Sequence, residues 1–104
     1  MSVLLEFSMF PTDQGESVSA YVSPVIAMIR DSGVSYRLTP MGTVIETATL
    51  GEALALVARA YEILEAAGCK RVYSALKLDI RKGREQRLEG KIASVRGRIG
   101  EVRD

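Results

Sequence analysis

The chain has 104 residues, of which 47% are hydrophobic and 26% are charged, and it contains no histidine and a single cysteine, Cys69. This length fits one compact domain with its own core, and the composition excludes both a disordered chain and a disulfide scaffold. Without histidine, and with only one thiol, the chain lacks the side chains most used in acid–base catalysis and metal binding. We therefore expect no catalytic residues, no metal site and no cofactor.

Charge divides the chain unevenly. Residues 1–80 carry 6 basic and 9 acidic residues, whereas residues 81–104 carry 8 and 4. A basic end can bind nucleic acid, but interspersed acids and an apolar stripe favour packing of this segment against protein. No apolar run approaches the roughly 20 residues of a membrane span, and the first residues lack the pattern of a signal peptide. We expect a cytoplasmic protein that binds neither nucleic acid nor membrane.

The first quarter of the chain predicts a strand followed by a helix. Apolar and polar residues alternate over residues 3–10, which is typical of a strand with one buried face. Apolar residues then recur at helical spacing over residues 18–29, with Ser17 as the expected N-cap and Gly33 beyond the helix end. Pro24 lies within this segment and indicates either a kink, which the earlier start of the periodicity favours, or the true helix start.

The middle of the chain predicts a hairpin, a second helix and a further strand. Residues 35–39 and 43–47 read as short strands joined by a Pro-Met-Gly turn. Thr49 and Glu52 form the pattern of a capping box, and the apolar stripe after them predicts a helix that Gly68 ends. Alternation returns over residues 71–80 and predicts the last strand.

A basic amphipathic helix is expected after Gly83. Its apolar residues follow one another in steps of 4, 3, 4 and 3, which resembles a coiled-coil seam, and they are Leu88, Ile92, Val95, Ile99 and Val102.

The element order predicts an α+β, ferredoxin-like βαββαβ fold, an antiparallel sheet with two helices on one face, plus a C-terminal helix. We assign residues 1–82 to the ligand-binding domain and 83–104 to the helix, either within that domain or at its oligomer interface. The face opposite the helices would expose Leu4, Glu6 and Phe10 together. A face that mixes large apolar groups with charges needs a cover, so we expect a dimer or tetramer.

Several short motifs resemble those of the small thiamine-binding protein family. They are Glu16-Ser17-Val18-Ser19-Ala20-Tyr21-Val22, Ser32-Gly33-Val34-Ser35-Tyr36-Arg37-Leu38, Pro40-Met41-Gly42-Thr43-Val44-Ile45-Glu46 and Lys77-Leu78-Asp79-Ile80-Arg81. The resemblance covers Val3 to about Arg81 and departs from the family pattern at Thr47-Ala48, where many relatives have glycine. It implies a ferredoxin-like fold, dimers that pair into tetramers, and thiamine or its hydroxymethylpyrimidine part as ligand.

Glu46 is the first candidate for contact with such a ligand. An aminopyrimidine offers a ring nitrogen that can be protonated beside an exocyclic amine, and a carboxylate can bind both. Strand alternation places Glu46 on the open face with Glu6, which is a second candidate. The alternative is a structural ion pair of Glu46 with Lys77 or Arg37.

Hydroxyls and aromatic rings supply the other candidates. Ser17 and Ser19 lie at the start of the first helix, where hydroxyls and free N–H groups can hold a polar ligand, although both can also be ordinary helix-start residues. Thr43 follows a glycine that lets a ligand approach the backbone, or is an ordinary strand residue. Tyr21 and Tyr36 can stack on a flat ring or pack at the core edge.

The sequence therefore predicts a non-enzymatic binding protein for thiamine or its hydroxymethylpyrimidine part. Two other classes remain open at this point. One is a cofactor-free dimer of the small monooxygenase type that acts on an aromatic substrate. The other is a structural module that drives oligomerisation.

Overall fold

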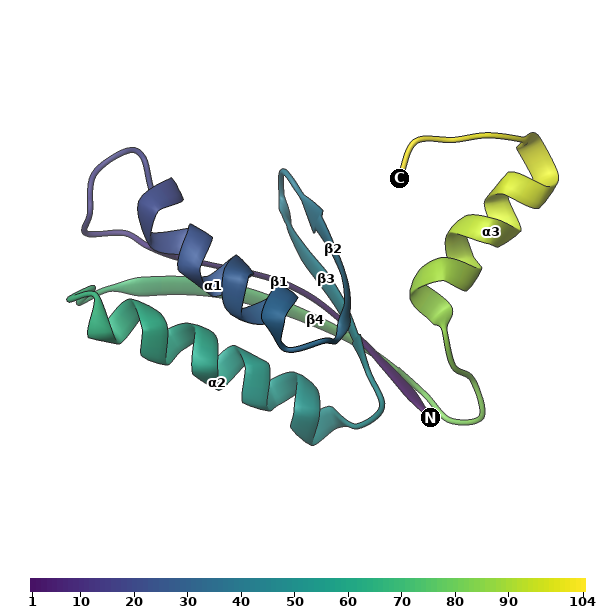
Figure 1. Ribbon diagram of the computed structural model, residues 1–104, viewed down its shortest axis with the longest axis horizontal. Coiled ribbons are helices and arrows are strands. Elements are labelled where there is room, and N and C mark those ends of the chain that lie inside the picture. The colour runs from purple at the N-terminus through teal and green to yellow at the C-terminus, as the bar shows by residue number, and fades with distance from the viewer.

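The computed structural model describes all 104 residues, and its element order is the predicted one (Figure 1). The elements are β1 (Ser2–Pro11), α1 (Ser19–Asp31), β2 (Ser35–Thr39), β3 (Gly42–Thr47), α2 (Leu50–Ala66), β4 (Val72–Arg81) and α3 (Arg87–Ile99). The ferredoxin-like βαββαβ arrangement with an added C-terminal helix is thus confirmed.

The four strands form one antiparallel sheet in the order β2-β3-β1-β4. Leu5 of β1 lies between Ile45 of β3 and Leu78 of β4, which fixes the register across the central strands. Successive side chains of a strand point to opposite faces. Val3, Leu5, Phe7 and Met9 therefore face α1 and α2, and Leu4 and Glu6 face the opposite side, as the alternation predicts.

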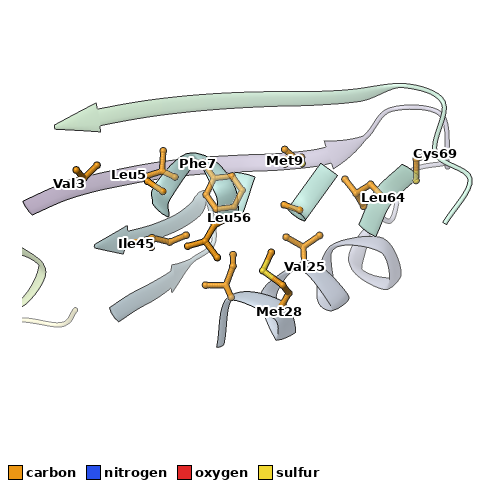
Figure 2. Close-up of a cluster of buried hydrophobic side chains, with 13 residues drawn as sticks. Val3, Leu5, Phe7, Met9, Val25, Met28, Ile45, Leu56, Leu64 and Cys69 are labelled. Carbon is orange, nitrogen blue, oxygen red and sulfur yellow. The ribbon is translucent and has the colours of Figure 1, made fainter. Parts of the chain in front are cut away.

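The hydrophobic core lies between the sheet and the pair of helices α1 and α2, which run along the same face (Figure 1). Thirteen buried side chains form it, and Figure 2 shows β1 supplying a row of four above those from β3 and the helices. None of the thirteen comes from β4. That edge strand contributes only Val72, which is partly buried and packs against the core.

The start of α1 differs from the prediction. Ser17 is not the N-cap, because the helix begins at Ser19 and its cap residue is Val18, which makes no side-chain hydrogen bond. The Val18 carbonyl instead accepts the first helical hydrogen bond from the N–H of Val22 at 3.0 Å. Val18 is partly buried, and burying its apolar side chain offsets the roughly 1 kcal/mol that a hydroxyl cap contributes. The helix continues through Pro24, so a start at that proline is wrong.

The start of α2 follows the prediction. The Thr49 side chain accepts a hydrogen bond from the N–H of Glu52 at 3.2 Å, which is one of the two hydrogen bonds of a capping box. At the other end Gly68 takes a φ of +86°, a left-handed conformation that glycine adopts without steric cost.

The C-terminal helix α3 packs on β1 and β3, at the end of the sheet where the N-terminus lies (Figure 1). It covers the face away from α1 and α2, because it contacts Glu46, whose side chain shares that face with Leu4. Its apolar stripe is buried only at the beginning: Leu88 is 8% exposed, whereas Ile99 is 71% exposed. The helix ends at Ile99, so Val102 lies outside it. No helix in the chain combines the length and apolar character needed to cross a membrane.

Candidate ligand-binding site

Two cavities lie on opposite faces of the sheet. The first, here called the hairpin cavity, measures about 750 Å³ and lies between α1 and the β2–β3 hairpin. The second, here called the α3 cavity, measures about 1000 Å³ and lies between the open face of the sheet, α3 and the C-terminal tail. Both volumes are in the range of small-molecule sites.

The hairpin cavity is an apolar slot with hydroxyl groups along its walls. Phe7 and Met9 of β1 contribute apolar surface from the sheet, and α1 contributes Val22, Val25 and Ile26. The hydroxyls come from different elements: Ser19 and Ser23 lie on α1, and Thr43 lies on β3. Arg30 is the one charged side chain in the lining, and it pairs with Asp31 at 2.9 Å.

The hairpin turn holds the far wall of this cavity in place. The Thr39 hydroxyl accepts hydrogen bonds from the N–H groups of Met41 and Gly42 and donates to the Gly42 carbonyl. A Cβ at Gly42 would lie 3.0 Å from the Phe7 carbonyl oxygen, which is tighter than most Cβ contacts, so a larger residue would push β3 away from β1. The turn thereby fixes Thr43, which is 3% exposed, beside the cavity.

Glu46 lies on the other face and is already engaged by the protein. Its Oε2 accepts hydrogen bonds from the Ser2 hydroxyl and from the Arg87 N–H at 2.8 Å, and its Oε1 accepts one from the Leu88 N–H at 3.1 Å. Arg87 and Leu88 are the first two residues of α3, whose N–H groups have no partner within the helix. The Glu46 carboxylate thus caps α3 from a distant strand.

The environment of Glu46 holds its carboxyl ionised. Burial raises the pKa, but the hydrogen bonds from Ser2, Arg87 and Leu88 together outweigh burial, and the net pKa is lower than the ordinary 4.5. The guanidinium of Arg87 lowers this pKa further through its charge. A carboxylate at a helix N-terminus is also stabilised by the helix dipole.

Arg87 is the buried cation of this junction. It is 5% exposed, and its guanidinium donates to the Ser2 hydroxyl, to the Ser2 carbonyl and to the Asp79 carbonyl. It also pairs with the Asp79 carboxylate at 3.1 Å. Every charge in this group has an opposite charge or a dipole beside it, which is the condition for burying an arginine.

The structure brings three of the seven predicted site residues together: Ser19, Thr43 and Tyr36 all line the hairpin cavity. Ser17 is exposed in the loop before α1, outside both cavities. The Tyr21 hydroxyl donates to the Gln14 side chain at 2.8 Å, and neither cavity includes Tyr21 in its lining.

The two acidic candidates lie on the opposite face. Glu6 lines the α3 cavity and pairs with Lys77 at 3.5 Å, in an exposed position. The alternative expected for Glu46, an ion pair with Lys77 or Arg37, is not what the structure shows. Lys77 forms an ion pair with Glu6, and Arg37 forms ion pairs with Glu89 and Asp104.

Sequence reasoning missed Ser23 and Arg30 in the hairpin cavity, and Arg87 at the foot of α3. Ser23 was within reach, because it lies four residues after Ser19 and therefore on the same side of α1. Arg87 carried no such signal, since its partners are distant in the chain and nothing local distinguishes it from the other basic residues nearby.

Known proteins place this chain in a family. A sequence model of thiamine-binding proteins matches residues 5–96. A UPF0045 protein of Mycobacterium bovis is 41% identical over 95 residues, which cover 91% of this chain and 92% of the relative. A UPF0045 protein of Methanothermobacter thermautotrophicus is 35% identical over 83 residues, which cover 80% and 84% of the two chains. Neither name states an enzymatic activity.

Solved structures share the fold. The crystal structure of a hypothetical protein from Methanocaldococcus jannaschii superposes with a TM-score of 0.79 at 33% identity, over 90% of this chain and 95% of the other. A Thermotoga maritima protein, for which a role in thiamine biosynthesis or salvage has been suggested, superposes with a TM-score of 0.78 over 92% and 100% of the chains. At 22% identity the second likeness shows the fold alone. The family model and the relatives that match along nearly the whole chain show that the chain belongs to the thiamine-binding protein family.

Proposed function

We propose that this protein is a non-enzymatic binding protein that holds the hydroxymethylpyrimidine part of thiamine, free or within thiamine, in the hairpin cavity. The observation that carries the proposal is the meeting of Ser19, Tyr36 and Thr43, from three separate elements, around one apolar slot. Membership of the thiamine-binding family supports the choice of ligand.

The lining of the hairpin cavity suits a flat, uncharged heteroaromatic ring. Phe7, Phe10 and Tyr36 offer aromatic surface, and ring pairs contribute about 0.5 to 1.5 kcal/mol beyond burial. A hydroxyl both donates and accepts, so Ser19 and Thr43 can answer an exocyclic amine and a ring nitrogen. The charged thiazolium part of thiamine gains nothing from a cavity whose one charged residue is Arg30, so it would lie toward solvent.

The prediction that Glu46 contacts the ligand has a structural cost. Three protein donors occupy its carboxylate, and two of them belong to the first turn of α3. A pyrimidine at Glu46 would have to displace that turn. The hairpin cavity needs no such rearrangement, and we therefore assign the ligand there and give Glu46 the role of holding α3.

Self-association as a dimer or tetramer is also part of the proposal. Its support is the apolar surface that a single chain leaves open, including Leu76, Leu78 and Ile80, which are 40% to 46% exposed. The cytoplasmic location expected from the single cysteine stays a prediction.

Isothermal titration calorimetry with hydroxymethylpyrimidine tests the ligand assignment, and two serines provide a matched pair. Ser19→Ala removes a hydroxyl from the cavity, and the loss of one hydrogen bond of about 0.5 to 1.5 kcal/mol should weaken binding roughly 2- to 13-fold. Ser17→Ala removes the same group two residues away, outside the cavity, and should leave the affinity unchanged. Equal effects of both substitutions, or no heat of binding for the native chain, would contradict the proposal.

A further inference from the structure

The α3 cavity has apolar walls and takes no part in the function proposed above. Leu4 and Val44 of the sheet, Ile92 and Val95 of α3 and Val102 of the C-terminal tail all line it. Apolar walls of this kind bind the hydrocarbon part of a small molecule. The volume of about 1000 Å³ leaves room for a chain or ring of ordinary metabolite size.

The charged side chains on the β4 side of this cavity are paired with one another. Lys77 pairs with Glu6, and both Arg87 and Lys91 pair with Asp79. The two carboxylates would also repel an anion placed beside them. A charged group of a ligand is therefore more favourably placed at the opposite side of the cavity.

Arg37 lies at that opposite side, because its strand β2 is the other edge of the sheet. Its guanidinium connects three elements: it pairs with Glu89 of α3 at 2.6 Å and with Asp104 of the tail at 3.3 Å. Its Nε is buried and has no hydrogen-bond acceptor. Every nitrogen of an arginine side chain is a donor, so Arg37 keeps one donor that the chain itself does not satisfy.

The tail that supplies a carboxylate to Arg37 is held mainly by side-chain contacts. After α3 ends at Ile99, the chain runs back toward β2 (Figure 1). Asp104 then bridges Arg37 and Arg96, at 3.3 Å from each. Residues 101–104 make no backbone–backbone hydrogen bond. Because exposed ion pairs contribute little free energy, a ligand can displace this tail at low cost.

We propose that the α3 cavity is a second binding site, for a small molecule with one carboxylate and an apolar body, and that Asp104 competes with that carboxylate for Arg37. The ligand carboxylate would accept hydrogen bonds from Nε and from a terminal nitrogen of Arg37, in the two-point geometry that arginine favours. The apolar body would lie against Val44 and Ile92. This site is independent of the hairpin cavity, which lies on the other face of the sheet.

The charges favour a single carboxylate over other ligand charges. An incoming carboxylate replaces that of Asp104, so Arg37 stays paired. A second negative charge would lie closer to Glu6 and Asp79, which line the same cavity. A cation would be repelled by Arg37 and by Arg103, which also lines the cavity and takes part in none of the ion pairs.

Backbone NMR during titration with octanoate tests this site, and two further probes each lack one part of the ligand. Octanamide has the apolar body without the charge, and acetate has the carboxylate without the body. Octanoate should give saturable shift changes at Arg37, Ile92 and residues 101–104. Each partial probe should bind at least about tenfold more weakly, because it loses either a charged hydrogen bond or several buried CH₂ groups.

Substitutions of Arg37 and Asp104 should change the affinity for octanoate in opposite directions. Arg37→Gln removes the cation and should weaken binding roughly tenfold or more. Asp104→Asn removes the internal competitor and should strengthen binding roughly two- to fivefold, which corresponds to the loss of an exposed ion pair. Arg59→Gln makes the same change as the first variant at an exposed residue of α2, outside both cavities, and should leave the affinity unchanged.

Each part of the proposal has an outcome that overturns it. Equal binding of octanoate and either partial probe, or octanoate shifts centred on the hairpin cavity, would overturn the site. Equal effects of Arg37→Gln and Arg59→Gln would overturn the role of Arg37, and an unchanged or lower affinity in Asp104→Asn would overturn the competition. If Arg37→Gln does not fold, Arg37→Lys replaces it: this variant keeps the charge without the two-point geometry and should still bind octanoate more weakly than the native chain.

Discussion

Glu46 connects three parts of the chain that lie far apart in sequence. Its carboxylate accepts hydrogen bonds from Ser2 at the beginning of β1 and from Arg87 and Leu88 at the beginning of α3. A residue chosen from the sequence for its ability to bind a charged pyrimidine thus acts, in the structure, as a cap for a remote helix. The chemistry is similar in both roles, because N–H donors of a helix end and of an aminopyrimidine can both donate to a carboxylate.

Glu46→Gln is expected to lower the free energy of unfolding by about 1 to 2 kcal/mol, the lower part of the range for hydrogen bonds to a charged group, because the carboxylate is only partly buried. An amide accepts at its oxygen alone, so one of the donors of α3 loses its partner. Chemical denaturation measures the change. Glu6→Gln is the control, since that exposed residue should change stability by less than about 0.5 kcal/mol.

The loss of stability caused by Glu46→Gln should also depend on pH. Because the pKa of Glu46 is lower in the folded state than its ordinary 4.5, its stabilisation is complete above pH 4.5 and is lost as the pH falls through the folded value. The difference in stability between native chain and Glu46→Gln should therefore shrink at acid pH. Asp79, whose pKa the Arg87 and Lys91 side chains lower, remains in both proteins, so part of the acid sensitivity persists. A difference that stays constant from pH 7 to about pH 3 would contradict this role for the Glu46 charge.

At the scale of elements, the sequence patterns predicted the type of each helix and strand more reliably than the residues at which it begins. Period-two alternation predicted both β1 and β4, and a capping box predicted the start of α2, because these signals depend on neighbouring residues alone. The start of α1 coincides with the partial burial of Val18 beside the hairpin cavity, which the local sequence does not reveal. The sequence also predicted the apolar stripe of α3, but it did not predict the surface of the sheet against which the helix packs.

The sheet of the same chain covers the apolar stripe of α3 at Leu88. Further along the helix the apolar residues of the stripe are exposed. Leu88→Asp should therefore detach α3, since it places a charge in a buried position, and we expect a loss of roughly 2 to 3 kcal/mol. Ile99→Asp makes the same change at a residue 71% exposed and should be nearly neutral. Trypsin provides a second measurement, because Lys82 and Arg84 lie between β4 and α3. Faster cleavage there in both variants, or in neither, would contradict this account of α3.

At the scale of the whole molecule, the sequence was sufficient for the topology and for part of the candidate site. Ser19 and Thr43 were chosen for their hydroxyls, and the fold brings them to one cavity. Ser17 was chosen by the same reasoning and lies outside it, because α1 begins only at Ser19 and Ser17 is exposed in the loop before the helix. The partners of Glu46 and the exposed row of β4 depend on contacts between distant residues, for which a single sequence carries no signal.

The central claim is that the ligand occupies the hairpin cavity, and backbone NMR during titration with hydroxymethylpyrimidine tests it most directly. The account predicts saturable chemical-shift changes in the first half of α1 and in the β2–β3 hairpin, centred on Ser19 and Thr43. The amides of Arg87 and Leu88, which report on the Glu46 carboxylate, should keep their shifts. Changes centred on Glu46 and the start of α3, with the hairpin unaffected, would contradict the assignment.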